Sequence, residues 1–313
     1  MGSELRYAVI GTGALGGFYG ARLQRAGAEV HYLLRSDYAH VKQHGLVVES
    51  PDGDFTLPDV NAYADAQKMP PCDVVIVALK TTQNDRLAST LPTLTETGIV
   101  LVLQNGLGVE AQAAEWVGSD RVLGGLCFLC SNKVGPGHIR HLDYKKIAMG
   151  EYRADQSAGG VTERMEAIAQ DFERANIPIE RAADLVLARW KKLMWNIPFN
   201  GLSVILNATT DAMMGDDNAR TLARTLMEEV RQGANSQGRL VPAEFTQTML
   251  DHTAEMRPYR TSMKIDYDEK RPLEVEAMYG APLRAAQAQG VALPHIETLY
   301  HQLKFLDQQN RRG

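Results

Sequence analysis

Residues 7–17 read Tyr-Ala-Val-Ile-Gly-Thr-Gly-Ala-Leu-Gly-Gly, and this stretch decides the fold. An apolar run enters Gly11-x-Gly13-x-x-Gly16 directly, and a helical segment follows. In such a unit the first glycine permits a tight turn, the second lets backbone N–H groups approach a pyrophosphate, and the third lets the helix pack closely on the strand. The helix N-terminus adds partial positive charge there. A glycine-rich turn without a ligand is the alternative, but the flanking strand and helix favour dinucleotide binding.

Composition limits the class of protein. The chain has 313 residues, of which 44% are hydrophobic, enough for two domains with cores of their own. Its net charge is -5 without a long run of like charges, so nothing indicates a surface for nucleic acid or anionic membranes. The longest apolar runs are strand-sized, and residues 1–6 do not read as a signal peptide. We expect a cytoplasmic enzyme whose partners are small molecules or a second copy of the chain.

Cys127 and Cys130 have the spacing of a redox or metal-binding pair. The apolar run before them, residues 122–126, indicates a buried strand instead, in which a separation of three residues points the two thiols to opposite faces. No second ligand pair is present to complete a zinc site. We therefore expect no metal centre.

The first half of the chain alternates short apolar runs with helical segments, which is typical of a parallel sheet covered on both faces. Strands are expected at residues 5–10, 29–34, 73–79 and 98–103. Pro51-Asp52-Gly53 predicts a turn that joins residues 46–50 and 54–57 in a hairpin. Beyond Arg121, a meander that extends the sheet is expected from residues 122–129, 138–141 and 146–149.

From residue 182 onward the strand-like runs disappear. Long helical stretches are predicted at residues 185–206, 221–237 and 274–289. The expected fold class is therefore α/β: a Rossmann-type dinucleotide-binding domain over residues 1–181, followed by an all-α domain over residues 182–313.

The second expected strand lacks the acidic residue that usually holds the ribose hydroxyls of NAD about 20 residues after the glycines. It ends instead in Arg35-Ser36, which places a guanidinium and a hydroxyl where a 2′-phosphate would lie. The predicted cofactor is NADP(H). A solvated surface arginine is the alternative.

Two further strand ends carry polar residues, Lys80 with Gln83 and then Gln104-Asn105-Gly106. Ligands of such sheets bind in the crevice beyond the carboxyl ends of the strands. Each group alone is typical of loops, but three consecutive strand ends of this kind favour a ligand site.

Lys192, Asn196 and Asn200 recur every four residues in an apolar helical stretch, so they share one helix face. Hydrogen bonding between helices in a core is the alternative to ligand binding. Pro198 removes a backbone donor within the same stretch and is expected to bend the helix.

Two helix starts are expected farther along. Ser262 reads as an N-cap, and Glu274, soon after Pro272, suits a helix N-terminus. Neither residue alone requires a catalytic role.

Taken in order, these residues resemble the ketopantoate reductase family, the NADPH-dependent 2-dehydropantoate 2-reductases of pantothenate synthesis. The resemblance covers nearly the whole chain and implies a helical domain similar to the C-terminal domain of 6-phosphogluconate dehydrogenase, and a homodimer. Its motifs are Gly11-Thr-Gly-Ala-Leu-Gly16, Arg35, Leu79-Lys80-x-x-Gln83, Gln104-Asn105-Gly106, Trp190-x-Lys192-x-x-x-Asn196-x-x-x-Asn200, and Ser262-Met263 with Arg271-Pro-x-Glu274.

The resemblance also implies roles for these residues. Lys192 is implied as the catalytic lysine, which donates a proton or hydrogen bond to the ketone oxygen, and Glu274 as an essential glutamate close to cofactor and substrate. An ammonium there stabilises the negative charge that develops on oxygen in the transition state. Substrate binding is implied for Lys192, Asn196, Asn200 and Ser262. Cofactor binding is implied for Gly11, Thr12, Gly13, Ala14, Leu15, Gly16, Arg35, Lys80, Asn105, Cys130 and Glu274.

Two positions depart from the family pattern. Thr210 stands where asparagine is frequent, and Tyr279 precedes Gly280 where Asn-Gly is common. Both are expected toward the substrate. They leave open a reductase of another 2-oxo acid beside one that converts 2-dehydropantoate to (R)-pantoate. A non-catalytic NADP(H)-binding protein is a third hypothesis, against which the lysine and the two asparagines argue.

Overall fold

The computed structural model describes residues 4–312, apart from the side chains of residues 92–94 and 312. The described chain divides into two compact units. The first comprises the residues up to Gln104 together with Val109–Leu185, and the second comprises Asn105–Gly108 with the residues from Val186 onward.

The first unit is built on a ten-stranded sheet of order β4-β3-β9-β8-β7-β6-β1-β2-β5, with β10 paired to β9. Its parallel centre consists of β7 (Ile99–Val102), β6 (Val74–Val77), β1 (Arg6–Ile10) and β2 (Glu29–Leu33), and β5 (Asn61–Tyr63) extends it in parallel. The four strands expected from the sequence are thereby confirmed. The chain moves from β1 to β2 in one direction and from β6 to β7 in the other, which is the doubly wound arrangement.

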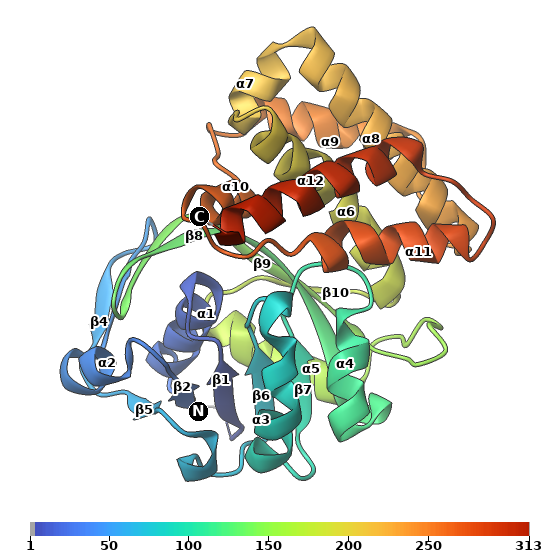
Figure 1. Cartoon of the computed structure of the whole chain (residues 1–313). Coiled ribbons are helices and arrows are strands. Elements are labelled where there is room, and N and C mark those ends of the chain that lie inside the picture. Colours follow the sequence, from blue (N-terminus) through green and yellow to red (C-terminus); the bar gives the residue numbers. More distant parts are fainter. Residues whose placement is uncertain (1–3, 313) are drawn as a thin grey trace. The chain divides into compact units, whose positions relative to one another are not determined.

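Helices cover both faces of this sheet (Figure 1). Because crossovers between parallel strands are right-handed, reversal of the strand order places α1 (Ala14–Arg25) on one face and α3 (Leu87–Leu94) on the other. Alternate residues of β1 show the same division: Tyr7 and Val9 pack in the core that includes α1 and α5 (Glu163–Arg174), whereas Ala8 is buried on the opposite side. The remaining short elements are α2 (Tyr38–His44), η1 (Ala66–Lys68), η2 (Thr81–Arg86), α4 (Val109–Val117) and η3 (Ser119–Arg121).

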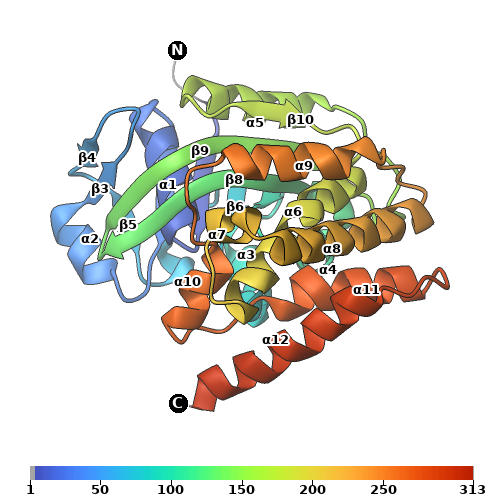
Figure 2. The ribbon, with the colours of Figure 1, turned by 90° about the horizontal axis from the view of Figure 1, so that it is seen from above.

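The expected meander is wrong. Two strands of 14 residues each, β8 (Val122–Gly135) and β9 (His138–Glu151), form one long antiparallel hairpin (Figure 2). Register shifts after Phe128 keep residues 142–145, which include Asp143 and Lys145, within a continuous strand, because a bulge absorbs the irregularity without ending the pairing.

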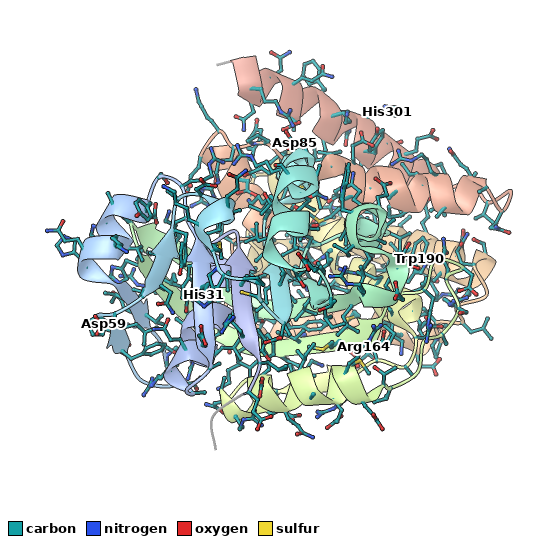
Figure 3. The ribbon with its side chains drawn as sticks, turned by 90° about the horizontal axis from the view of Figure 1, so that it is seen from below. His31, Asp59, Asp85, Arg164, Trp190 and His301 are labelled. Atoms are coloured by element: carbon teal, nitrogen blue, oxygen red, sulfur yellow. The ribbon has the colours of Figure 1, made fainter. Side chains whose placement is uncertain are left out.

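The long hairpin connects the remaining strands. β9 pairs in parallel with β3 (Leu46–Glu49), which forms the expected hairpin with β4 (Phe55–Leu57), and with β10 (Ile179–Arg181). At the end of β9 the buried carboxylate of Glu151 pairs with Arg164, which projects from α5 (Figure 3).

The second unit is helical. α8 (Asp217–Ser236) buries an apolar stripe at helical spacing that includes Ala223, Met227, Val230 and Ala234. Trp190, marked in Figure 3, is fully buried in the same core and lies against Gly233. The other helices are α6 (Leu185–Ile205), α7 (Thr210–Gly215), α9 (Glu244–Glu255), α10 (Ser262–Asp268), α11 (Ala281–Gln287) and α12 (Pro294–Arg312).

Three helix boundaries differ from expectation. Thr261, and not Ser262, is the N-cap of α10, because its hydroxyl accepts the Lys264 amide at 3.2 Å. α8 begins four residues early, after the cap Asp216. The helix expected at 274–289 contains a π-helical turn, Glu276–Gly280, before α11. Within residues 4–312, no helix combines the length and apolar character needed to cross a membrane.

Candidate active site

The loop between β1 and α1 has the close packing that its glycines require. Gly11 has a φ of +94°, and a Cβ there would lie 2.6 Å from the backbone nitrogen of Leu79. A Cβ on Gly16 would lie 2.4 Å from the carbonyl oxygen of Gly11. On Gly13, by contrast, a Cβ would meet nothing within 4 Å. Two of the glycines are therefore fixed by packing, and the third borders open space.

That open space lies at the N-terminus of α1. Gly13 is the N-cap and has no side chain with which to cap the helix, and the first turn contains no acidic residue. Around the loop, Thr12 donates to the carbonyl of Leu33 at 3.2 Å, and Ser131 donates to the carbonyl of Ala14 at 3.4 Å. Helix N–H groups without a capping carboxylate suit an anion, so the loop fits a dinucleotide pyrophosphate.

Arg35 lies at the end of β2, where its exposed guanidinium donates to the side-chain oxygen of Gln83 at 3.1 Å. Gln83 belongs to η2, and the half-buried Lys80 is the residue that precedes this helix. The first unit thus brings together the polar residues that follow β2 and β6. Arg35 and Lys80 therefore place positive charge at the ends of β2 and β6, the two strands that flank β1 and its glycine loop.

Asp37 carries the first carboxylate after Arg35 in the sequence, and this carboxylate contacts the β8–β9 hairpin and Ser36. Its Oδ2 lies 2.5 Å from the ammonium of Lys133 and accepts the Gly137 amide at 3.0 Å, while its Oδ1 accepts the Ser36 hydroxyl at 2.9 Å. Burial alone would raise the pKa of Asp37, but these donors together lower it below its ordinary value.

Cys130 is buried in the irregular part of β8, opposite Asp143 of β9. The next residue, Ser131, donates to the carbonyl of Ala14. Cys130 is therefore adjacent in sequence to a residue that contacts the glycine loop. Cys127 is buried as well, within the apolar core.

Asn105 belongs to the second unit together with the rest of Asn105–Gly108. Leu107 donates its amide to the carbonyl of Ala277 at 3.0 Å, and Gly106 lies against Ala277. Ala277 is part of the π-helical turn that follows Glu274, so Asn105 and Glu274 lie on segments that contact each other.

Lys192, Asn196 and Asn200 lie on α6, as predicted. Lys192 is half-buried, and the two asparagines are 6% and 3% exposed. The side-chain oxygen Oδ1 of Asn200 accepts the Met263 amide at 3.4 Å, and its side-chain nitrogen Nδ2 lies 4.0 Å from the sulfur of Met278. Asn200 therefore joins α6 to the segment that carries the exposed Ser262 and to the turn after the buried Glu274.

Comparison with known proteins identifies the family. The family model described as "Ketopantoate reductase PanE/ApbA" matches residues 7–154, and its C-terminal counterpart matches residues 184–307. A 2-dehydropantoate 2-reductase of Nostoc sp. is 63% identical over 312 residues, which cover 99% of this chain and 98% of that protein.

This chain belongs to the ketopantoate reductase family. Its members are oxidoreductases that use NADPH, as the sequence predicted. A crystal structure of 2-dehydropantoate 2-reductase from Geobacter metallireducens superimposes with a TM-score of 0.92 at 42% identity, covering 97% of this chain and 99% of that one. A ketopantoate reductase of Staphylococcus aureus, described as dimeric, has a TM-score of 0.82 at 22% identity, with coverage of 98% and 100%. The expected fold class is confirmed.

Thr210 and Tyr279, which depart from the usual family pattern, are buried residues that support the helical unit. The Thr210 hydroxyl accepts the Tyr259 amide at 3.1 Å. Tyr279 donates to the carbonyl of Ile197 at 3.0 Å, next to Pro198, and burial raises the pKa of its hydroxyl far above the ordinary value. Both side chains make intramolecular hydrogen bonds within the helical unit, and their position toward the substrate stays a prediction.

The pairs of Asp37 with Lys133 and of Leu107 with Ala277 were not predicted from the sequence. Each joins segments far apart in the chain. No local spacing signals such contacts, although the positive φ of Gly106 is a feature that Asn-Gly sequences commonly have.

Proposed function

We propose that this chain reduces 2-dehydropantoate to (R)-pantoate with NADPH. The observation that carries the proposal is the face of α6, where a half-buried lysine and two buried asparagines follow at four-residue spacing in a ketopantoate reductase family chain. The sheet domain, residues 1–181, binds NADPH, and the helical domain, residues 182–313, binds substrate.

The chemistry follows from charge. NADPH, when bound, supplies a hydride to C2 of the 2-oxo acid. The ketone oxygen then gains negative charge, which the Lys192 ammonium stabilises before it donates a proton to that oxygen. Asn196 and Asn200 orient the substrate through their amides, and Ser262 binds near its carboxylate. Because the amide of Asn200 is already fixed by Met263, the orienting group loses little freedom on binding.

The cofactor residues divide by chemistry. The loop residues Gly11, Thr12, Gly13, Ala14, Leu15 and Gly16 hold the pyrophosphate with backbone N–H groups. Arg35 binds the 2′-phosphate, and its contact with Gln83 keeps the guanidinium at the end of β2. Lys80, Asn105, Cys130 and Glu274 line the remainder of the cofactor site.

Lys192→Ala tests the proposal. NADPH oxidation in the presence of 2-dehydropantoate is measured for the wild type, for Lys192→Ala and for Lys191→Ala. Lys191 is a matched control because it is also half-buried and lies on the same helix, with its ammonium 5.7 Å from the ring centre of Phe245. The proposal requires a large loss for Lys192→Ala alone, and equal rates in all three proteins would contradict it.

Another 2-oxo acid remains the second candidate substrate. A panel of branched and aromatic 2-oxo acids, ranked by kcat/KM, separates the candidates. The proposal expects 2-dehydropantoate to rank first. Tight NADPH binding without turnover of any of them would instead indicate a non-catalytic binding protein.

The proposed partner is a second copy of the chain in the cytoplasm. The relative from Staphylococcus aureus is described as dimeric, which supports this assembly. Light scattering coupled to gel filtration measures the mass in solution, and a monomer mass at assay concentration would exclude the dimer.

A further inference from the structure

A carboxylate, that of Asp37, follows two residues after Arg35, the residue proposed to bind the 2′-phosphate of NADPH. Tyr38 donates its amide to the carbonyl of Arg35 at 3.1 Å, so the chain turns tightly after β2. Asp37 is the third residue of this turn, two positions after Arg35. A free carboxylate there would repel a 2′-phosphate and would favour the ribose hydroxyls of NADH.

The Asp37 carboxylate does not accept hydrogen bonds from the backbone amides at the start of α2. Asp37 is at the N-cap of α2, yet its side chain does not cap that helix. Its Oδ2 instead lies against the Lys133 ammonium and the Gly137 amide, both from the β8–β9 hairpin. The side chain of Asp37 is 8% exposed, whereas that of Lys133 is 34% exposed.

We infer that Lys133 is a specificity-determining residue, which neutralises Asp37 and thereby lets Arg35 accept a 2′-phosphate. The inference rests on the proposed use of NADPH. An aspartate carboxylate is ionised near neutral pH, so the negative charge of Asp37 persists beside Arg35 and needs a counter-charge. The Gly137 amide and Ser36 hydroxyl hold the carboxylate in place, but only the ammonium supplies a full positive charge.

Direct binding tests the inference without turnover. Dissociation constants for NADPH and NADH are measured by quenching of protein fluorescence in the wild type and in Lys133→Met, Asp37→Asn and the double variant. In Lys133→Met the ratio of the NADH to the NADPH constant is expected to fall about tenfold, because a buried negative charge is left unpaired two residues after Arg35. The double variant is expected to recover most of the wild-type ratio, because it removes the unpaired charge.

Lys146→Met is the matched control. Lys146 lies on the same hairpin and pairs with Glu180 at 2.7 Å, so it removes one ammonium from one ion pair with no connection to Asp37. Its ratio is expected to equal that of the wild type. Lys133→Gln, which removes the charge and keeps a hydrogen-bond donor, serves as the second variant if Lys133→Met has lower thermal stability.

Two results would overturn the inference: an unchanged ratio in both Lys133 variants, or a double variant whose ratio stays as low as that of Lys133→Met. Failure of the proposed function gives a different pattern. In that case 2-dehydropantoate is not reduced by the wild type, while the ratio of binding constants still falls in the Lys133 variants and recovers in the double variant.

Discussion

The amide of Leu107 donates a hydrogen bond to the carbonyl oxygen of Ala277 at 3.0 Å. This bond joins the segment that carries Asn105 to the π-helical turn Glu276–Gly280, which follows Glu274. A π-turn adds a residue to a helix and recurs at functional sites. Here it gives the two proposed cofactor residues a common support within the second unit.

Gly106→Ala is expected to disrupt this support. Gly106 has a φ of +113°, and a Cβ would lie 2.6 Å from both the Cβ and the carbonyl oxygen of Ala277. Gly108→Ala is the control, because Gly108 also has a positive φ of +70° but its Cβ would meet nothing within 4 Å. Both variants also have a backbone penalty of about 1–2 kcal/mol or more, because both φ angles are positive. Denaturant unfolding and kcat should show a further loss for Gly106→Ala, and equal losses would contradict the account.

Glu276 anchors the same turn to α12 and should do so in a pH-dependent way. Its carboxylate accepts hydrogen bonds from Tyr300 at 2.7 Å and Lys304 at 2.8 Å, and it pairs with Arg284 at 3.2 Å. Burial would raise its pKa, but these partners outweigh burial and lower it from 4.5 to about 2.

A pKa that is lower in the folded state stabilises the protein above the unfolded value, and the contribution is lost as pH falls through the folded value. Glu276→Gln should therefore lower the melting temperature at pH 7, and the difference from wild type should shrink between about pH 4.5 and pH 2. Thermal unfolding followed by circular dichroism measures it. A difference that stays constant across this range would show that the charge contributes nothing.

Tyr279→Phe separates packing from substrate recognition. It removes the donor to the Ile197 carbonyl while keeping the ring, so stability should fall by about 1 kcal/mol. Since the side chain is fully buried, KM for the 2-oxo acid should stay near the wild-type value. A changed order of preference among 2-oxo acids would restore the role that the sequence suggested for this residue.

Arg35→Ala should lower kcat/KM for NADPH by about 10–100-fold and leave that for NADH nearly unchanged, because a charge-assisted contact to the 2′-phosphate is lost. Arg25→Ala, which removes another exposed arginine of the first unit, is the control. Steady-state rates with each nucleotide give the comparison. Parallel losses for NADPH and NADH would remove Arg35 from the 2′-phosphate site.

Local patterns predicted much of this molecule. The glycine loop and the four central strands follow from short apolar runs and from turns that only glycine permits, and the face of α6 follows from spacing by four. The boundary at Thr261 did not follow, because Thr261 and Ser262 are adjacent hydroxyl residues and either suits an N-cap.

Contacts between distant segments could not be predicted. Asp37 and Gly137 are 100 residues apart, and nothing near Asp37 indicates that its carboxylate turns toward a hairpin. The β8–β9 hairpin was divided in the prediction at residues 142–145, where the structure has register shifts and a positive φ at Tyr144, yet the two strands pair on both sides of this irregularity. Tyr279 shows the same limit, since its depth in the core depends on α6.

The central claim is reduction of a 2-oxo acid by NADPH with Lys192 as the proton donor. Its most direct test is the initial rate of NADPH oxidation with 2-dehydropantoate, compared between the wild type and Lys192→Ala at saturating cofactor. We expect kcat to fall by about 10²–10³-fold or more in the variant, with NADPH binding retained. A Lys192→Ala enzyme as fast as the wild type, or a wild type that does not oxidise NADPH with this substrate, would contradict the account.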